Sequence, residues 1–595
     1  MIRTPLRPLA RILEARQKGE NPDAIERENI RLRHEEMRDK LRVRAEQRLM
    51  LLGVMYFCAF LVIGARMGGL AASEPEEPRA ATNGASIVSQ RADIVDRKGR
   101  ILATNMETHS LYAHPQQMIE PERAAEELGK IFPEIDVADL KKRFTSDRKF
   151  LWVRKKLSPE QKQAVHDIGE PGLLFGPREM RLYPNGPIAA HVLGGTRFGQ
   201  EGVHSAEVVG TAGIERFYDD VLRDPAREGA PLELSLDLTI QAAAEKVLYG
   251  GMKIMGAKGA AMVLMDAHSG EIVSLASLPD FDPNDRPLPA TGNDPSISPL
   301  FNRAVQGVYE LGSTFKIFAS AQALDLGLVN PSTMIDIRGP LKWGKHKIRD
   351  FQNYGRELDV TRIIVKSSNI GTARLAQMVG TKRQKEFLEQ LGFLDITPVE
   401  LQEAKRAKPL LPPNWSELST MTISYGHGIS TSPLHLAAGY AAIANGGYAV
   451  QPTLLRQNGA KYGPRVLSAS AAEASRAMLR LVVSHPDGTA NFGDVPGYGV
   501  AGKTGTADKP KPTGGYYEDK VIATFASIFP ISDPKYVLVL VLDEPEIYAA
   551  GELRRTAGWT AVPVAAEMIE RLAPLLGLRP AIEPASLAGI TLSSN

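Results

Sequence analysis

A run of apolar residues near the N-terminus constrains this chain most. "LMLLGVMYFCAFLVIGA", residues 49–65, carries no charge and is bracketed by Arg48 and Arg66. Seventeen residues is the short end of what crosses a bilayer, and the following "MGGLAA" can extend the span. A buried helix of a soluble domain is the alternative.

Charge on the two sides of this run predicts its orientation. A tail rich in Arg and Lys precedes it, and "SEPEEP" follows it. The tail is far longer than the n-region of a cleavable signal peptide. The positive-inside rule therefore predicts a single-pass membrane anchor, with residues 1–48 as a cytoplasmic tail, 49–66 as the transmembrane helix and everything beyond about residue 70 exported.

Length and composition narrow the class of the exported part. The chain has 595 residues, enough for two or more domains, and its formal net charge of +2 gives no reason to expect nucleic-acid binding. The single cysteine, Cys58, lies in the apolar run, which excludes a disulfide framework and thiol chemistry. The sequence has no HExxH motif and no Cys/His cluster, so we expect neither a metal nor another cofactor.

Changes of texture divide the chain into six regions. We expect a linker at 67–88, a pedestal of short strand-like and helix-like pieces at 89–230, a second domain at 231–580 and a C-terminal tail at 581–595. Within the first region, residues 25–49 alternate in charge sign and contain neither Gly nor Pro. That pattern favours a solvated helix that runs into the membrane span, with a partner-binding tail as the alternative.

The order of predicted strands and helices in the second domain indicates its fold class. Residues 259–279 and 521–545 each read as two apolar strands around a tight turn, at His268–Gly270 and at Ser532–Pro534. Helical patterns occupy 434–447 and 561–577. The order predicts an α+β domain in which helices flank an antiparallel sheet.

One lysine of this domain stands in an unexpected place. In "VYELGSTFKIFASAQALDLG" (308–327), Lys316 is the only charge between Thr314 and Ala323, in a stretch that is apolar nearly all round and therefore predicts a buried helix. Ser313, three residues earlier, would open that helix and share its face, with the two Cβ atoms roughly 5–6 Å apart. Burial disfavours an ammonium group and makes lysine a usable base for a hydroxyl nucleophile. Lys316 would then activate Ser313; an N-cap serine with a snorkelling lysine is the alternative.

Ser-x-x-Lys alone is a weak motif. It recurs at 146–149 and 532–535, where no apolar helix carries the lysine. A second polar group, in "VKSSNIGTARLAQ" (365–377), places Ser367 and Asn369 ahead of a helical pattern, either as a helix cap or as partners of a substrate.

A third group, "GYGVAGKTGTADKP" (497–510), formally spells a phosphate-binding P-loop from Gly497 to Thr504. A P-loop must lead into a helix, whereas glycines and prolines follow here. We therefore expect a strand whose glycines let a ligand approach, with Lys503, Thr504 and Thr506 along a polar edge.

"STFK", "SSN" and "KTGT" occur in that order, about 50 and then about 135 residues apart. In this the chain resembles the serine acyltransferase superfamily of penicillin-binding proteins and serine β-lactamases. "RADIVDRKGRILATN" (91–105), "RLYPNGPIAAHVLG" (181–194) and "GTAGIERFYDDVL" (210–222) resemble the pedestal motifs of class B penicillin-binding proteins. Residues 345–371 are most similar to the division-specific FtsI type, and the resemblance covers roughly residues 89 to 578. Leu311 departs from the family, which usually has proline at that position.

The resemblance implies a peptidoglycan DD-transpeptidase that cross-links stem peptides during septal cell-wall synthesis and is a target of β-lactams. Ser313 would attack the D-Ala–D-Ala carbonyl with Lys316 as base, and an amine of a neighbouring stem would resolve the acyl-enzyme. The resemblance also implies roles for the remaining motif residues. Ser367 would relay a proton, and Asn369 would bind the substrate amide and support Lys316. Lys503 would supply positive potential, and the segment Thr504-Gly505-Thr506 would bind the terminal carboxylate of the substrate. Backbone N–H groups of Ser313 and Thr506 would form the oxyanion hole.

Several alternatives stay open at this point. They are an elongation-specific homologue, a non-catalytic β-lactam sensor and a DD-carboxypeptidase; a β-lactamase would normally lack the pedestal and the anchor. No glycosyltransferase segment precedes the pedestal, so the resemblance implies a SEDS-type (FtsW-like) glycan polymerase and other divisome proteins as partners, with lipid-linked precursor as the source of stem peptides. His427, between two glycines, is expected to be structural or exposed rather than to line the cleft.

Overall fold

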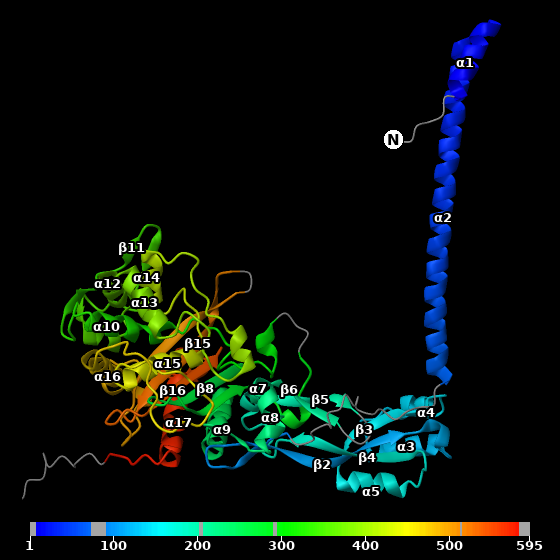
Figure 1. Cartoon of the computed structure of the whole chain (residues 1–595). Coiled ribbons are helices and arrows are strands. Elements are labelled where there is room, and N and C mark those ends of the chain that lie inside the picture. The colour runs from blue at the N-terminus through cyan, green and yellow to red at the C-terminus, as the bar shows by residue number, and fades with distance from the viewer. Residues whose placement is uncertain (1–6, 73–90, 202–205, 290–293, 512–513, 582–595) are drawn as a thin grey trace, which may run out of the picture.

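The computed structural model of the chain describes residues 7–72, 91–201, 206–289, 294–511 and 514–581 (Figure 1). The predicted linker from residue 73 onward, and all but the first residue of the predicted C-terminal tail, lie outside these ranges.

The apolar run belongs to one long helix. After α1 (Arg7–Lys18), α2 spans Pro22–Ala72, 51 residues or about 75 Å of helix. It is the one helix of the described residues that is both long and apolar enough to cross a membrane, and its apolar window is not buried against any other part of the chain. The predicted helix at 25–49 is confirmed. The helix also continues to Ala72, so the first residues of the predicted linker are helical.

A mixed sheet forms the pedestal. Its strands run in the order β3–β2–β1–β7, and β4 pairs with the long β2. β1 and β7 are parallel, whereas β2 is antiparallel to its neighbours. The strands are β1 (Ile94–Val95), β2 (Ile101–Ala113), β3 (Leu151–Leu157), β4 (Leu173–Leu182) and β7 (Leu232–Glu233).

Short helices and a hairpin complete the pedestal. The helices are α3 (Pro121–Ile131), α4 (Val137–Phe144), α5 (Pro159–Asp167), α6 (Ala190–Leu193), α7 (Gly213–Phe217) and α8 (Asp219–Leu222), and the hairpin is β5 (Gly195–Glu201) with β6 (Ala206–Ala212). A buried ion network closes its inner end, where Glu215 accepts hydrogen bonds from Arg91 and Arg181, each at 2.6 Å.

The second domain is built on a five-stranded antiparallel sheet in the order β14–β15–β16–β8–β9. Both predicted hairpins are confirmed, as β8–β9 and β15–β16. The strands are β8 (Gly259–Asp266), β9 (Ile272–Leu278), β14 (Ala501–Pro510), β15 (Tyr516–Phe529) and β16 (Tyr536–Asp543). The central strands are apolar and buried on both faces, so helices must cover both.

Helices cover the sheet as predicted. α9 (Leu238–Ile254) and α17 (Ala561–Leu575) pack together against the sheet, and α15 (Pro433–Ala444) and α16 (Ala469–Ser484) also pack on its strands. A lobe of α10 (Lys316–Asp325), α11 (Val360–Val365), α12 (Asn369–Val379), α13 (Thr381–Gln390) and α14 (Glu417–Ile423) adjoins α16. The described residues of the domain also form three short two-stranded sheets. They pair β10 (Met334–Asp336) with β13 (Glu357–Asp359), β11 (Leu341–Trp343) with β12 (His346–Ile348), and β17 (Ile547–Ala549) with β18 (Glu552–Arg554).

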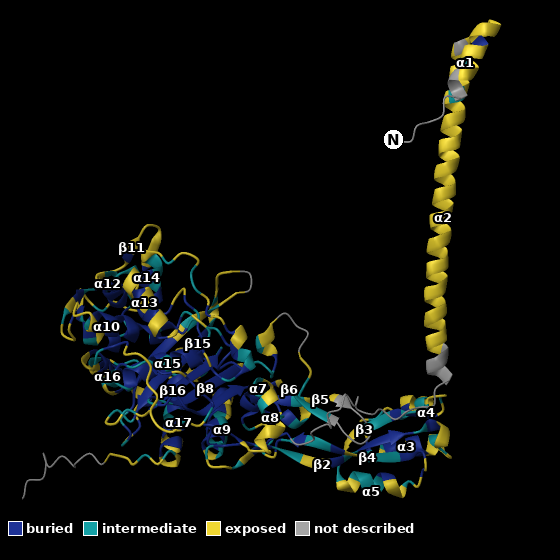
Figure 2. Cartoon of the chain, viewed as in Figure 1, coloured by how far each residue is buried: buried dark blue, intermediate teal, exposed yellow. Residues whose placement is uncertain are grey.

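Two hydrophobic cores fill the body of the protein (Figure 2). The smaller core lies at the outer end of the pedestal, among α3, α4, α5 and the far halves of β2, β3 and β4. The larger core is continuous from pedestal residues such as Ile94 and Leu102 into the main sheet. Across the same junction, Arg97 donates to Glu271, next to β9, at 2.7 Å. The inner pedestal and the second domain therefore share one packed interior.

Candidate active site

The predicted nucleophile stands at the entry of a buried helix. A 3₁₀ turn, Gly312–Phe315, holds Ser313 and leads directly into α10, whose first residue is Lys316. Lys316 is 1% exposed and sits among apolar neighbours, which confirms the predicted buried helix. Ser313 thus lies in the turn that precedes α10 rather than in its first α-helical turn. Leu311, at the usual proline position, is buried in the main core, which holds the turn by packing.

Three glycines allow segments to approach this turn closely. A Cβ atom on Gly505, in β14, would lie 2.2 Å from the carbonyl oxygen of Leu311. A Cβ on Gly426 would lie 2.1 Å from the carbonyl oxygen of Gly312, and one on Gly312, at φ +57°, would be 3.2 Å from that of Thr506. Any side chain at 505 or 426 would push β14 or the 425–428 loop away from the turn. Gly505 therefore acts through packing and not through a side-chain contact with a ligand.

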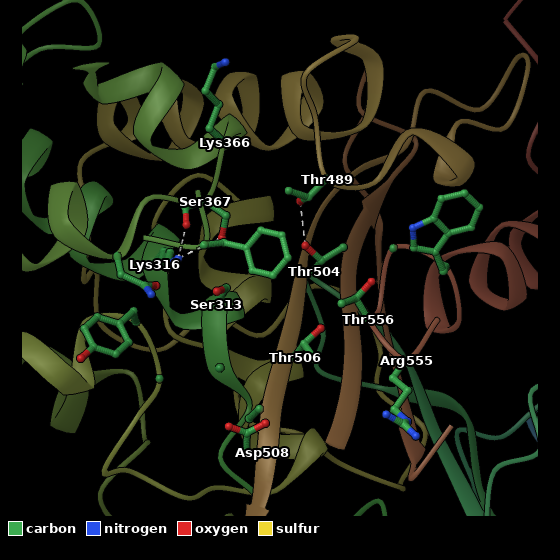
Figure 3. Close-up of a pocket in the computed structure, with 18 of the residues that line it drawn as sticks. Ser313, Lys316, Lys366, Ser367, Thr489, Thr504, Thr506, Asp508, Arg555 and Thr556 are labelled. Carbon is green, nitrogen blue, oxygen red and sulfur yellow. Dashed lines mark hydrogen bonds between the residues drawn. The ribbon is translucent and has the colours of Figure 1, made fainter. Parts of the chain in front are cut away.

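Two lysines, Lys316 and Lys503, share the hydroxyl of Ser367, and Figure 3 shows the contact of Lys316 with Ser367 near Ser313. The Nζ of Lys316 donates to Oγ of Ser367 at 2.9 Å and to its carbonyl oxygen at 2.5 Å. The Nζ of Lys503 donates to the same Oγ at 3.1 Å and to the carbonyl oxygen of Thr504 at 3.2 Å. Within the described part of the chain, no hydrogen bond joins the Ser313 hydroxyl to Lys316. Lys316 is therefore held by Ser367 while Ser313 faces the cleft.

The backbone of Ser367 is strained to make this bridge. Ser367 follows α11 with φ +60°, a left-handed conformation that a non-glycine residue adopts at a cost of about 1–2 kcal/mol. It occupies the place after the helix C-cap where glycine is common. Ser368, the next residue, caps α12 through a hydrogen bond from Gly371 N–H to its Oγ at 2.9 Å. The helix cap expected at this motif is thus Ser368, which leaves the Ser367 hydroxyl for the lysines.

Burial sets the charge state of both lysines. Desolvation, and then the positive charge of Lys503, hold the pKa of Lys316 well below its ordinary value, against a smaller opposing effect of Asp350. Desolvation also lowers the pKa of Lys503, to about 7. At neutral pH the pair therefore does not hold its full complement of protons, and at least one amine is available as a base.

Asn369 is placed differently from what its predicted role required. Its side-chain amide donates to the carbonyl oxygen of Arg349 at 2.9 Å, so the support of Lys316 comes from Ser367 instead. Asp350 fixes the same segment by accepting from Ser368 Oγ at 2.8 Å and from the N–H of Ile370 at 3.0 Å. Asn369 still lines the cleft, where its amide can meet a bound ligand.

The threonines of the third motif face the cleft from β14, which confirms the strand predicted there over the P-loop alternative. Thr506 Oγ1 accepts from the N–H of Ala557 at 3.0 Å, so its own proton is available to a ligand. Thr504 Oγ1 lies 2.7 Å from Oγ1 of Thr489. Thr489 belongs to no motif and precedes β14 by a dozen residues, so no pattern in the sequence indicates it.

A cleft of about 880 Å³ joins these groups. At one end Glu310 ties three segments together: it accepts from Gly428 N–H at 2.8 Å and Tyr516 OH at 3.0 Å, and its other oxygen is 3.0 Å from Nδ1 of His427. The hydrogen bond to Glu310 raises the pKa of His427. His427 was expected to be structural or exposed; it is exposed and also lines the cleft.

The structure also locates the other two Ser-x-x-Lys matches and bears on metal binding. Ser146 and Ser532, the serines of the other two Ser-x-x-Lys matches, are not among the residues that line the cleft. Ser146 donates to the carbonyl oxygen of Arg143 at 2.7 Å. Among the described residues, no group of three or more His, Cys, Asp or Glu side chains is placed to hold a metal ion.

Comparison with known proteins adds to this geometry. The penicillin-binding protein transpeptidase domain matches residues 260–569, and the penicillin-binding protein dimerisation domain matches 86–226. A probable peptidoglycan D,D-transpeptidase FtsI of Caulobacter vibrioides is 35% identical over 571 residues, 94% of each chain. The peptidoglycan D,D-transpeptidase FtsI of Escherichia coli is 26% identical over 77% of this chain and 80% of its own.

A solved structure agrees with these matches. Penicillin-binding protein 3 of Mycobacterium tuberculosis, in complex with aztreonam, superposes with a TM-score of 0.61 at 27% identity, over 83% of this chain and 98% of its own. Fold and matches together define a class, the serine acyltransferases in which a pedestal precedes a transpeptidase domain. Within it, the chain belongs to the class B penicillin-binding proteins of the FtsI type.

The charge state of Lys503 can be tested through stability. Its pKa is about 7 in the folded chain and about 10.4 when unfolded, so between these values the unfolded state binds more protons and stability rises with pH, by up to about 1.4 kcal/mol per pH unit. Lys503→Met has no proton to gain. Calorimetry of the full chain in detergent should show a melting temperature that rises more from pH 7 to 9.5 in the native protein than in Lys503→Met. Parallel profiles would mean an ordinary pKa for Lys503.

Proposed function

We propose that this chain is a septal peptidoglycan DD-transpeptidase in which Ser313 is the acylated nucleophile. The observation that carries the proposal is the pair of buried lysines bridged by Ser367 in the cleft that Ser313 faces. A hydroxyl needs a base before it becomes nucleophilic, and a lysine held partly neutral by burial is such a base.

Acylation would begin with proton transfer from Ser313 to Lys316. The Ser313 oxygen bonds to the penultimate D-Ala carbonyl carbon, and the tetrahedral oxyanion accepts from the backbone N–H groups of Ser313 and Thr506. The close contact of Gly312 with Thr506 sets the spacing of these two donors. Ser367, bonded to both lysines, relays a proton to the leaving amine, the C–N bond breaks and terminal D-Ala departs.

Recognition of the donor would depend on its terminal carboxylate. Thr506 has a free hydroxyl proton, Thr504 lies on the same face of β14, and Lys503 supplies positive potential behind them. The amide of Asn369, which also lines the cleft, would bind the peptide backbone. An amine from a second stem peptide then attacks the ester carbonyl, and its bond to carbon replaces the serine ester and completes the cross-link.

The remaining assignments concern place and partners. We infer that residues 1–48 are cytoplasmic and the catalytic domain periplasmic, because the cations flank the span on its N-terminal side. We keep the predicted regions as a proposal, with the tail at 1–48, the span at 49–66, the linker at 67–88, the pedestal at 89–230, the transpeptidase domain at 231–580 and the C-terminal tail at 581–595. The helix α2 runs on to Ala72, into the first residues of that linker. Glycan strands would come from an FtsW-like polymerase in the same membrane, alongside other divisome proteins.

The nucleophile can be identified by mass. Labelled penicillin should add once per chain, on the peptide that contains Ser313, since the strained lactam presents an amide carbonyl to the same hydroxyl. Ser313→Ala should lose the label and keep its melting temperature, while Ser146→Ala and Ser532→Ala should label normally. An adduct that survives Ser313→Ala would refute the assignment.

The base can be tested by replacing it with a cation that cannot give up its proton. Arginine at position 316 is always protonated and cannot accept the proton of Ser313, so Lys316→Arg should acylate roughly a hundred- to ten-thousand-fold more slowly. Stopped-flow acylation rates, with circular dichroism as the folding control, measure this. Near-native acylation by folded Lys316→Arg would leave Lys316 a structural role only.

Orientation in the membrane is open to a reporter assay. Alkaline phosphatase, which is active only after export, should be active when fused after residue 80 and inactive when fused after residue 40. The reverse pattern would invert the proposed topology.

A further inference from the structure

The membrane-proximal part of α2 carries its charges on separate faces. Ile30, Met37 and Leu41 recur at intervals of seven and four residues, which places them in one stripe along the helix. Their side chains are in open water: the three residues are 49%, 56% and 61% exposed. Large apolar residues in register on a solvated helix are the pattern of a helix that packs against another helix.

Cations border this stripe on both sides. At 100° per residue, Arg27, Arg31 and Arg38 fall along one edge, and Arg33, Lys40 and Arg44 fall along the other. His34 lies within the stripe, and Asp23 and Glu26, near the N-terminal end of α2, are the acidic exceptions on this side. We call the stripe with its two borders the basic face.

Acidic residues gather on the opposite side. Glu28, Glu35, Asp39 and Glu46 fall there, with Leu32 and Val43 among them. The cations that are paired use partners on their own helix, as Arg31 does with Glu35 at 3.7 Å and Arg42 with Glu46 at 2.9 Å. Both pairs are exposed, so they are weak and can be exchanged for a partner's carboxylates.

The packing of α1 leaves the basic face open. Ala15 of α1 is 3% exposed, and on α2 the residues that are partly covered at this end are Ile25 and Asn29. Around the helix, Asn29 lies about 80° and Ile25 about 120° from Met37, on the flank beyond Arg33 and Lys40. The chain's own N-terminal helix therefore packs beside one border of the basic face and leaves the stripe of Ile30, Met37 and Leu41 exposed.

A second copy of this chain is a poor partner for the basic face. Two copies anchored in one membrane run parallel and in register, which would set Arg31, Arg38 and Lys40 against their own equivalents. The lipid surface does not reach the N-terminal part of this face, although Arg44 at its other end lies only about 8 Å from Leu49. Ile30 stands about 28 Å along the helix from Leu49, where the apolar run begins, and charges are screened over about 8 Å at physiological salt.

We propose that the basic face of α2 docks an α-helix of a partner protein that carries an apolar stripe bordered by Glu and Asp. The partner's apolar stripe would cover Ile30, Met37 and Leu41, and its carboxylates would pair with the cations on both borders. The inference concerns the segment ahead of the membrane span and does not rest on the transpeptidase function.

A designed peptide tests this proposal. The probe is a fluorescent synthetic helix with leucine at the a and d positions and glutamate at e and g; its control has lysine at e and g. The full chain is held in nanodiscs of phosphatidylcholine, and binding is followed by anisotropy. The glutamate peptide should bind, and more weakly as salt rises, whereas the lysine peptide should not.

Matched variants locate the contact. Met37→Asp should weaken binding of the glutamate peptide roughly tenfold or more, since it puts a charge in the apolar stripe. Val43→Asp, an equally exposed change on the opposite side of α2, should alter it less than twofold. Circular dichroism controls for helix content.

Three results would overturn the proposal. The first is equal binding of both peptides, or equal loss in Met37→Asp and Val43→Asp. The second is self-association of the full chain that Met37→Asp abolishes, which would assign the face to a second copy. The third is loss of peptide binding when phosphatidylserine replaces phosphatidylcholine, which would assign it to anionic lipid.

Discussion

Two buried lysine amines share one serine hydroxyl in the interior of this protein, and much of the architecture around the cleft depends on that contact. Lys316 and Lys503 are both buried, and each donates to Oγ of Ser367. Burying one such ion costs several kcal/mol, and a like charge close by adds to the cost. The structure meets this cost by letting the pair hold fewer protons. The same feature that destabilises the fold supplies the base that acyl transfer needs.

Unusual backbone conformations and close backbone contacts hold the lysines and Ser367 in place. Ser367 adopts a left-handed conformation that glycine would accept more readily, yet glycine would remove the bridging hydroxyl. At Gly505 and Gly426 a glycine is required, because any side chain there would collide with the turn that carries Ser313. The site is therefore specified as much by where side chains are missing as by where they are present.

Local sequence patterns were enough to predict the main helices and strands of the second domain. The buried α10, the hairpins β8–β9 and β15–β16 and the strand β14 each show their periodicity or their turn residues within one short segment. The motifs also brought Ser313, Lys316, Ser367 and Lys503 to one cleft. What pattern could not supply were contacts between distant segments. Glu310, His427 and Tyr516 meet only once the chain is folded, and Thr489 reaches Thr504 from a loop without any motif.

Asn369 shows a subtler limit. Its side-chain amide donates to the carbonyl oxygen of Arg349, while the hydrogen bonds of Lys316 go to Ser367. A motif fixes which residues come near one another. Which of two polar neighbours makes a given bond depends on backbone angles, here the positive φ of Ser367, and sequence spacing does not encode that sign.

The shared interior of pedestal and second domain has a mechanical consequence. Because Ile94 and Leu102 belong to the same core as the main sheet, and Arg97 is tied to Glu271, a pull on the inner pedestal loads the sheet at its β9 edge. Hydrogen-bonded ladders carry that load across β8, β16 and β15 to β14, the opposite edge, where Lys503 and Thr506 sit. The main sheet therefore connects the pedestal junction at its β9 edge with the strand that carries Lys503 and Thr506 at its other edge.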